Sequence, residues 1–306
     1  MNGMSWAAQY VHILGVLLPV FVCAGIGVGW AVKKLHFPGE FISTLVTSVT
    51  TPALVFHTIA TTELHDTMLL QILGATCAGI AIMACVAALM LRALRLPVAS
   101  LLPSATFPNG GNLGLPISYL AFGEIGLAVA VTVFAIFSLS QHTLGVGLLS
   151  MSSNANGSVK RKLPWAIVLS CGAAIFLRTL DIQLPAPFLA SAKLVGSITV
   201  PLMLISLGFA LATVSRSSLG AGTLVGSIRL VSGLAGAVVV IYGMNLPALV
   251  SAAIALQLLM PVAVASYLYT ERFTSVGAIS AGAVLASTGI FIVVSPLLIT
   301  WMTARI

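Results

Sequence analysis

The sequence predicts an all-α integral membrane protein, with roughly ten transmembrane helices in two inverted repeats of five. Three observations support this fold class: an apolar composition, basic residues that follow every second apolar segment, and motifs that recur half a chain length apart. Hydrophobic residues make up 59% of the 306 residues and charged residues 6%, and mean hydropathy is +1.14. Because about a quarter of a soluble domain is charged, this composition indicates that the lipid bilayer surrounds the chain.

Apolar segments separated by short polar breaks run along the whole chain. Their lengths are those of membrane helices, and the alternating apolar-polar pattern of a membrane barrel is absent from the sequence. Helices are then the only structure that can cross lipid. The predicted spans are 9–31, 40–60, 67–91, 97–122, 124–150, 164–180, 187–213, 224–245, 247–269 and 273–302.

The distribution of basic residues predicts the orientation, because cytoplasmic loops carry an excess of Lys and Arg. If ten helices cross alternately, most basic residues fall on one side and few on the other. The first side holds Lys33, Lys34, Arg92, Arg95, Lys160, Arg161, Lys162, Arg216 and Arg272, and the second holds Arg178, Lys193 and Arg305. Both termini are therefore predicted outside.

Several function classes are disfavoured by what the sequence lacks. The net charge of +7 comes from basic residues scattered in ones to threes, so no nucleic-acid partner is expected. The cysteines lie in apolar runs without metal-ligand spacing, and His65 between Glu63 and Asp66 is interpreted as a solvated loop. No nucleophile and base occur at a recognisable spacing. We therefore expect no catalytic residue, metal or cofactor, and an intramembrane enzyme is the least favoured function.

The longest polar stretch, Ser152–Lys162, divides the chain into two halves. Residues 1–150 form the predicted first repeat and 164–306 the second, joined by a cytoplasmic loop at 151–163. Because each half contains an odd number of helices, the halves should have opposite orientations in the membrane. Such inverted repeats are a common plan of secondary transporters.

Two motifs recur between the halves. Ser48–Leu54 and Ser197–Met203 both read Ser, β-branched, Thr, β-branched, Pro and then apolar residues, at an offset of 149. Ser118–Leu120 recurs as Ser266–Leu268 at an offset of 148. These matches in corresponding spans support the repeat.

The fourth span contains a strong helix-breaking segment, from Pro108 to Pro116, with two prolines, three glycines and two asparagines. Each proline removes a backbone donor and each glycine costs about 1 kcal/mol in a helix. Unwound backbone at membrane depth survives only where protein buries it or a wet cavity borders it. We therefore expect a hinge at Pro108, Gly110 and Gly111, and a second half-helix that begins near Leu115 and Pro116.

The ninth span is predicted to break as well, at Pro261, with Gln257 nearby. Paired broken helices in corresponding positions indicate a transport site. Helix N-termini at such a site present free N–H groups that suit an anion such as a carboxylate. Asn109 and Asn112 can add amide donors.

The threonines beside two prolines have two possible roles. Thr50 and Thr51 beside Pro52, and Thr199 beside Pro201, could face the site or bond carbonyls one turn back. Both prolines are predicted kinks.

The same ambiguity applies to residues in later spans. Ser287 and Thr288 could likewise face the site or bond their own helix. His142, next to Gln141, could line the cavity, although a packing role is favoured. Arg229 could meet an anion or extend to the cytoplasmic interface.

The motif Pro108-Asn109-x-x-x-x-Gly114-x-Pro116 resembles the fourth-helix signature of the auxin efflux carrier family, which includes plant PIN-type carriers. The run from Gly111 to Pro116 is especially similar to the bacterial branch. Thr143–Val146, Pro52–Leu54 and Met260-Pro261 add to a resemblance that covers nearly the whole chain.

This resemblance implies that helices four and nine cross at their breaks, as in bile acid symporters and sodium/proton antiporters. It implies an elevator-type movement in which helices 3–5 and 8–10 form a transport unit and helices 1, 2, 6 and 7 form a scaffold. It also implies a homodimer in the bacterial inner membrane.

The implied function is export of a small organic anion, such as an auxin-like compound or another carboxylate. The resemblance assigns Asn109, Asn112, Pro116 and Pro261 to the substrate site, to which the residues themselves add Gly114, Gln257, Gln141 and Thr51. The coupling ion stays open between a proton, sodium and none. The alternative is a channel or a ligand sensor that uses the same crossing.

Overall fold

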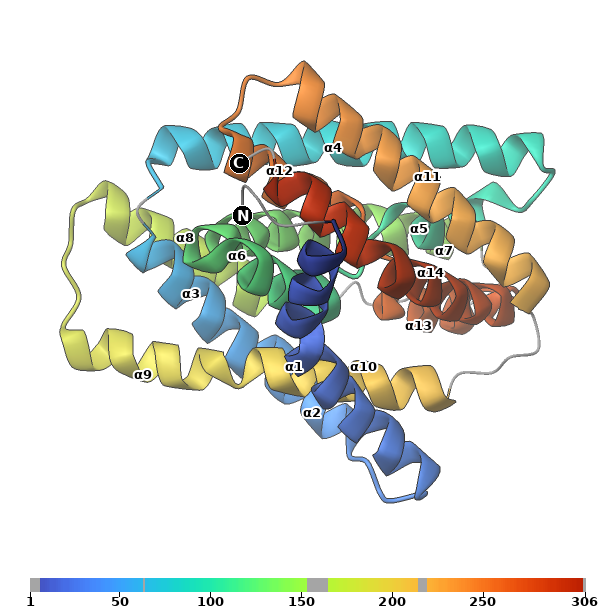
Figure 1. Cartoon of the computed structure of the whole chain (residues 1–306), viewed down its shortest axis with the longest axis horizontal. Coiled ribbons are helices and arrows are strands. Elements are labelled where there is room, and N and C mark those ends of the chain that lie inside the picture. Colours follow the sequence, from blue (N-terminus) through green and yellow to red (C-terminus); the bar gives the residue numbers. More distant parts are fainter. Residues whose placement is uncertain (1–5, 63, 153–164, 214–218, 305–306) are drawn as a thin grey trace.

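The computed structural model describes residues 6–62, 64–152, 165–213 and 219–304, and the regular elements of this part of the chain are helices, joined by short loops (Figure 1). Short elements labelled η are single turns of π-helix. In chain order the elements are α1 (Trp6–Val32), α2 (Gly39–Leu45), η1 (Val46–Thr50), α3 (Thr51–Thr61), α4 (Asp66–Ala93), α5 (Val98–Thr106), η2 (Gly110–Gly114), α6 (Leu115–Ser140), η3 (Gln141–Gly145), α7 (Val146–Ser152), α8 (Trp165–Thr179), α9 (Ala186–Ser197), α10 (Thr199–Thr213), α11 (Leu219–Gly243), α12 (Ala248–Leu258), α13 (Val264–Phe273) and α14 (Gly277–Thr303).

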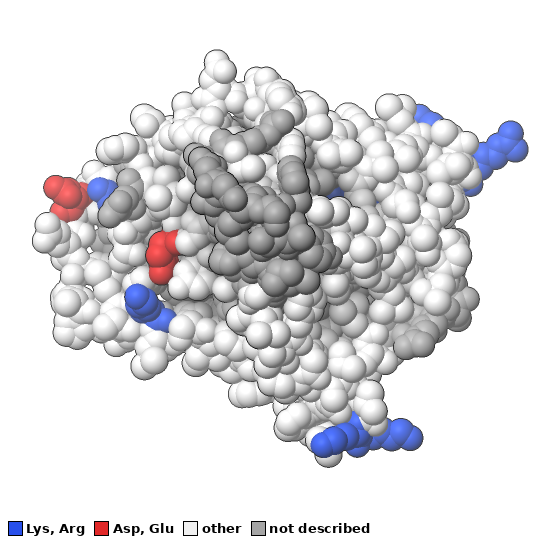
Figure 2. All heavy atoms as spheres, in the orientation of Figure 1, with Lys and Arg blue, Asp and Glu red and all other residues white. Residues whose placement is uncertain are grey.

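The helices agree with an all-α membrane protein. Among the described residues, five helical stretches are long and apolar enough to cross a bilayer. They are Thr67–Ala93, Gly110–Leu149, Ala186–Thr213, Leu219–Gly243 and Gly277–Thr303. On the face shown in Figure 2, most of the charged atoms drawn lie towards the margins, and most described atoms of this face are uncharged. Ten crossings and both external termini stay predictions, and the loop proposed at 151–163 lies outside the described residues from 153 onward.

A glycine separates the predicted fourth and fifth spans inside α6. Gly123 has φ +66° and ψ −155°, and its neighbour Glu124 is exposed. Side chains with a Cβ rarely adopt this conformation, whereas glycine adopts it freely. The chain therefore turns at Gly123, between a segment that ends at 122 and another that begins at 124.

The helices pack as two groups. In the first, α1 lies along α10, and α3 lies against α8 and α9. In the second, α11 packs on α4, α12 and α14, while α12 also packs on α6. Figure 1 shows α4 and α11 on the side of the molecule opposite α9 and α10. Contacts between the groups run through α6 and η2, and through α1 against α14.

Small residues set the closest approach within the first group. A Cβ on Gly27 of α1 would overlap the backbone of α10 near Ile205, and one on Gly208 of α10 would overlap Ala24. Glycines in this arrangement let two membrane helices pack backbone to backbone.

The motifs used to predict the repeat differ in their structural positions. Pro52 and Pro201 both lie in the first turn of an α-helix, α3 and α10. By contrast, the one β-bridge of the described residues pairs Pro108 with Val262, an offset of 154. Ser118 lies ten residues after Pro108 but Ser266 only four after Val262, so the Ser-Tyr-Leu match does not occupy equivalent positions. The inverted repeat stays a prediction that the proline motif supports.

Replacing Gly123 with alanine should lower stability by about 1–3 kcal/mol, because alanine must adopt a backbone conformation that is nearly restricted to glycine. Thermal unfolding of the purified protein would measure this. Gly289→Ala in α14 is the matched control, since a Cβ meets nothing within 4 Å at either site and Gly289 lacks the positive φ. Equal melting temperatures for the two variants would contradict the role given to Gly123.

Candidate functional site

The two helix breaks lie against each other. The first, at residues 107–109, separates α5 from η2, and the second, at 259–263, separates α12 from α13. Asn109 N donates to Pro261 O at 2.7 Å, and Ala263 N donates to Phe107 O at 3.2 Å. These bonds form a short antiparallel bridge at which the ends of α5, η2, α12 and α13 meet. We call this region the crossing.

Side chains from neighbouring helices bind further backbone groups at the crossing. Ser232 Oγ of α11 donates to Ala105 O at 3.0 Å. Arg229 Nη2, one turn earlier on α11, donates to Leu258 O at 2.6 Å. Val262 N donates to Ser287 Oγ of α14 at 3.0 Å. Because buried backbone groups without partners are costly in lipid, these three side chains stabilise the unwound segments.

Arg229 does not extend to the cytoplasmic interface. The side chain is 0% exposed and lies midway along α11, where its guanidinium reaches the C-terminal end of α12. The prediction that it would reach the interface is wrong, because the nearby carbonyl of Leu258 holds it inside the bundle. Sequence patterns gave no signal for this contact, which joins residues 29 positions apart.

The position of the Gln257 side chain explains why two residues of the first break region, Gly110 and Gly114, are glycines. Its Nε2 donates to Ser118 Oγ of α6 at 3.0 Å, and its Oε1 has no hydrogen-bond partner among the described residues. A Cβ on Gly110 would lie 2.9 Å from Oε1, and one on Gly114 would lie 2.7 Å from Nε2. The glycines therefore make room for a buried amide, in addition to any effect on helix stability.

Asn109 lies at the start of η2 and is 4% exposed. Its Nδ2 has no hydrogen-bond partner among the described residues. Asn112 is only half-buried on the same turn, and Pro116 lies in the first turn of α6, where proline is favoured. Gly111 packs beneath the ring of Phe134.

Gln141 belongs to a second polar cluster. Its Nε2 donates to Ser266 Oγ of α13 at 2.9 Å, and Ser266 Oγ donates to Pro103 O at 3.3 Å. Next to it, His142 bonds Tyr269 Oη through Nε2 at 2.9 Å, as a packing histidine does. Gln141 is thus linked through Ser266 to α13 after the second break and to α5 before the first, and no hydrogen bond joins it to Asn109 in the described part of the chain.

The threonines at the proline motifs do not bond back to their own helix. Thr50, Thr51 and Thr199 are buried, and their hydroxyls have no hydrogen-bond partner among the described residues. By contrast, Thr76 donates to Ile72 O one turn back at 2.7 Å. The interpretation that these three threonines bond a carbonyl one turn back is therefore wrong.

In the tenth span, Ser287 and Thr288 were predicted either to face the site or to bond their own helix, and the two residues differ. Ser287 donates to Ala283 O one turn back at 2.6 Å while it accepts from Val262, so it both bonds its helix and faces the crossing. The hydroxyl of Thr288 has no partner among the described residues.

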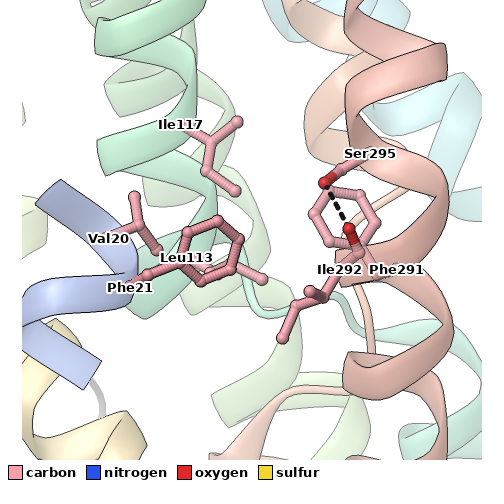
Figure 3. Close-up of a pocket in the computed structure, with 7 residues that line it drawn as sticks. All are labelled: Val20, Phe21, Leu113, Ile117, Phe291, Ile292 and Ser295. Carbon is pink, nitrogen blue, oxygen red and sulfur yellow. Dashed lines mark hydrogen bonds between the residues drawn. The ribbon is translucent and has the colours of Figure 1, made fainter. Parts of the chain in front are cut away.

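A small cavity lies beside the crossing, between α1, the η2–α6 segment and α14 (Figure 3). Its volume is about 10 Å³, close to that of one water molecule. Except for Ser295, its lining is hydrocarbon: Val20, Phe21, Leu113, Ile117, Phe291 and Ile292. A carboxylate-bearing ligand does not fit in this space, so access from this side requires the helices to separate.

A family model described as membrane transport protein matches residues 12–166, about half of the chain. The match covers α1 to the start of α8 and includes the first break. A search of curated proteins finds no match for the chain.

Replacing Gly114 with alanine should lower stability by about 1–3 kcal/mol, because the new Cβ overlaps the Gln257 amide. Adding Gln257→Ala should offset much of this loss, which a double-mutant cycle of thermal unfolding would measure. Gly74→Ala is the control, since a Cβ there meets nothing within 4 Å. Strict additivity of the two changes would refute the proposed contact.

Proposed function

Because the chain belongs to the membrane transport protein family, we propose that it is a secondary transporter that exports a small organic anion. Membership makes a catalytic role unfavoured and agrees with the helical, multi-pass structure. The observation that carries the proposal is the crossing itself. Two broken helices meet there at Asn109 and Pro261, inside the bundle.

The crossing is suited to an anion. The N-terminal ends of η2 and α13 both lie at it, and such ends carry free N–H groups and partial positive charge. Asn109 Nδ2 is a buried amide donor without a partner among the described residues. Among the described residues, Asp181 and Glu271 lie at or near helix ends instead, and Glu124 lies beside the turn at Gly123 in α6. A negatively charged ligand therefore meets donors rather than like charge.

Export follows from the membrane potential. A ligand with one negative charge gains about 2.3 kcal/mol per 100 mV when it leaves a negative-inside cell. We propose a monocarboxylate or another small organic anion as substrate, with the bacterial inner membrane as the location. A coupling ion is not required by this scheme, although a proton or sodium remains compatible with it.

An elevator-type movement is proposed from the two helix groups. The group with α1, α3, α8, α9 and α10 corresponds to the proposed scaffold, and the group with α4 to α7 and α11 to α14 to the transport unit. Tight glycine packing holds α1 to α10, whereas the small cavity of Figure 3 lies between α1 and the other group. We propose that the scaffold also forms the contact of a homodimer.

Transport into proteoliposomes, measured with a panel of radiolabelled carboxylates, tests the function. We expect saturable flux of at least one carboxylate, faster when voltage drives the anion. Conductance steps in a planar bilayer would instead indicate a channel. If no carboxylate binds or moves, the proposed substrate class is wrong.

Asn109→Ala should reduce that flux by roughly 10-fold or more, because a buried donor to a charged ligand contributes about 1.5–3 kcal/mol. Thermal stability should change little, since Nδ2 has no hydrogen-bond partner to lose in the described part of the chain. Gln183→Ala, an amide removed from an exposed loop, is the matched control and should transport normally. Unchanged flux in Asn109→Ala would exclude this amide from the site.

A further inference from the structure

The guanidinium of Arg229 is a buried positive charge with few hydrogen bonds and no nearby carboxylate among the described helices to offset it. The side chain is 0% exposed, and only Nη2 has a hydrogen-bond partner, the carbonyl of Leu258. Nε and Nη1 have no partner among the described residues. An ionised group away from water costs several kcal/mol unless an opposite charge or a full set of hydrogen bonds offsets it.

The helices around Arg229 offer no nearby opposite charge. α11 packs against α4, α5, α12 and α14. None of the sequences of α5, α11, α12 and α14 contains Asp or Glu, and α4 has one only at its first residue, Asp66. A carbonyl at the end of α12 supplies partial negative charge, which leaves most of the full positive charge uncompensated.

A second arginine shows what a structural role looks like in this chain. Arg178 of α8 donates to three backbone carbonyls, those of Ile59, Thr62 and Leu64, and remains half-buried. Arg229 makes one such bond although it is fully buried. Gly233, one turn away, makes room for the guanidinium itself, since a Cβ there would lie 2.8 Å from Nη1. Among the described residues, the guanidinium therefore retains donors that a cap alone does not need.

We propose that Arg229 is the countercharge of the transported anion, so that the loaded site is electrically neutral. This inference rests on the proposed function and narrows it to anions with a single negative charge, such as monocarboxylates. Among the described residues, Arg229 of α11 and Asn109 of the first break both have donors without hydrogen-bond partners. Arg229 Nη2 is bonded to Leu258 O at the end of α12, and Asn109 N is bonded to Pro261 O three residues further on. Both residues therefore contact the same short stretch of chain at the crossing, where the proposed anion would bind.

The proposal has an electrical consequence. When a monovalent anion occupies the site, its charge and that of Arg229 cancel, and movement of the loaded unit transfers no net charge. The empty unit then carries one positive charge. Exchange of labelled for unlabelled substrate moves only loaded units, so in the wild type it should not depend on voltage. In Arg229→Gln it should depend on voltage, because the loaded unit now carries the anion's charge alone.

Binding is measured first, on the purified full-length protein. Thermal shifts are recorded with acetate, benzoate and malonate at constant ionic strength, and with acetamide, benzamide and malonamide as uncharged counterparts. Arg229→Gln should weaken binding of the best monocarboxylate roughly 10- to 100-fold, and Arg229→Lys should recover part of it. Arg178→Gln, the matched control, should lose stability but keep the wild-type affinity.

Voltage dependence is then measured in proteoliposomes with the best monocarboxylate. Voltage-independent exchange in the wild type, together with voltage dependence in Arg229→Gln, supports the proposal. Voltage-dependent exchange in the wild type overturns it, and this measurement holds even if Arg229→Gln does not fold. Wild-type affinity in Arg229→Gln also overturns it. If the wild type binds and transports no anion, the proposed function fails instead.

Discussion

The structure depends on one constraint: unwound backbone inside an apolar bundle must find hydrogen-bond partners without water. Two short breaks meet this constraint mainly by bonding each other, through Asn109 to Pro261 and Ala263 to Phe107. Ser232, Arg229 and Ser287 then bind groups that the bridge does not reach. The positions of α11 and α14 beside the crossing follow from this requirement, and the same bonds keep four helix ends together in the interior.

The sequence predicted what depends on local chemistry. The cluster from Pro108 to Pro116 predicted a break in the fourth span, because proline and glycine act on the backbone where they stand. The structure has a shorter break, at 107–109, and Gly110 and Gly111 lie in a π-helical turn. The α-helix that follows begins at Leu115, as proposed, although a π-helical turn precedes it. The burial of Arg229 and its hydrogen bond were not predictable, because its partner Leu258 belongs to another helix. The predicted equivalence of Ser118 and Ser266 did not hold for the same reason. A short sequence match does not show where two segments of the chain cross.

The glycines at the first break have more than one role. Sequence reasoning treated Gly110 and Gly114 as helix-weakening residues, yet both also face the amide of Gln257. Their small size lets Gln257 reach Ser118 across the bundle. Thr50, Thr51 and Thr199 present the opposite case, since their hydroxyls are buried without the local bond that threonine usually makes in a helix. The local helix preferences of glycine and threonine therefore describe these residues incompletely, because contacts with other helices also determine their roles.

The geometry of the bridge bears on directionality. Its two hydrogen bonds are interchanged by one shift of 154 residues, since Asn109 corresponds to Ala263 and Phe107 to Pro261. The pair of bridge hydrogen bonds is thus symmetric and by itself distinguishes neither face of the membrane, whereas the two breaks differ in length and a π-helical turn follows only the first. In the proposed alternating access, any inherent bias between inward and outward states would arise from features that lack a counterpart. Arg229 is such a feature, because α4, the counterpart of α11 in the proposed inverted repeat, carries no charge between Asp66 and Arg92.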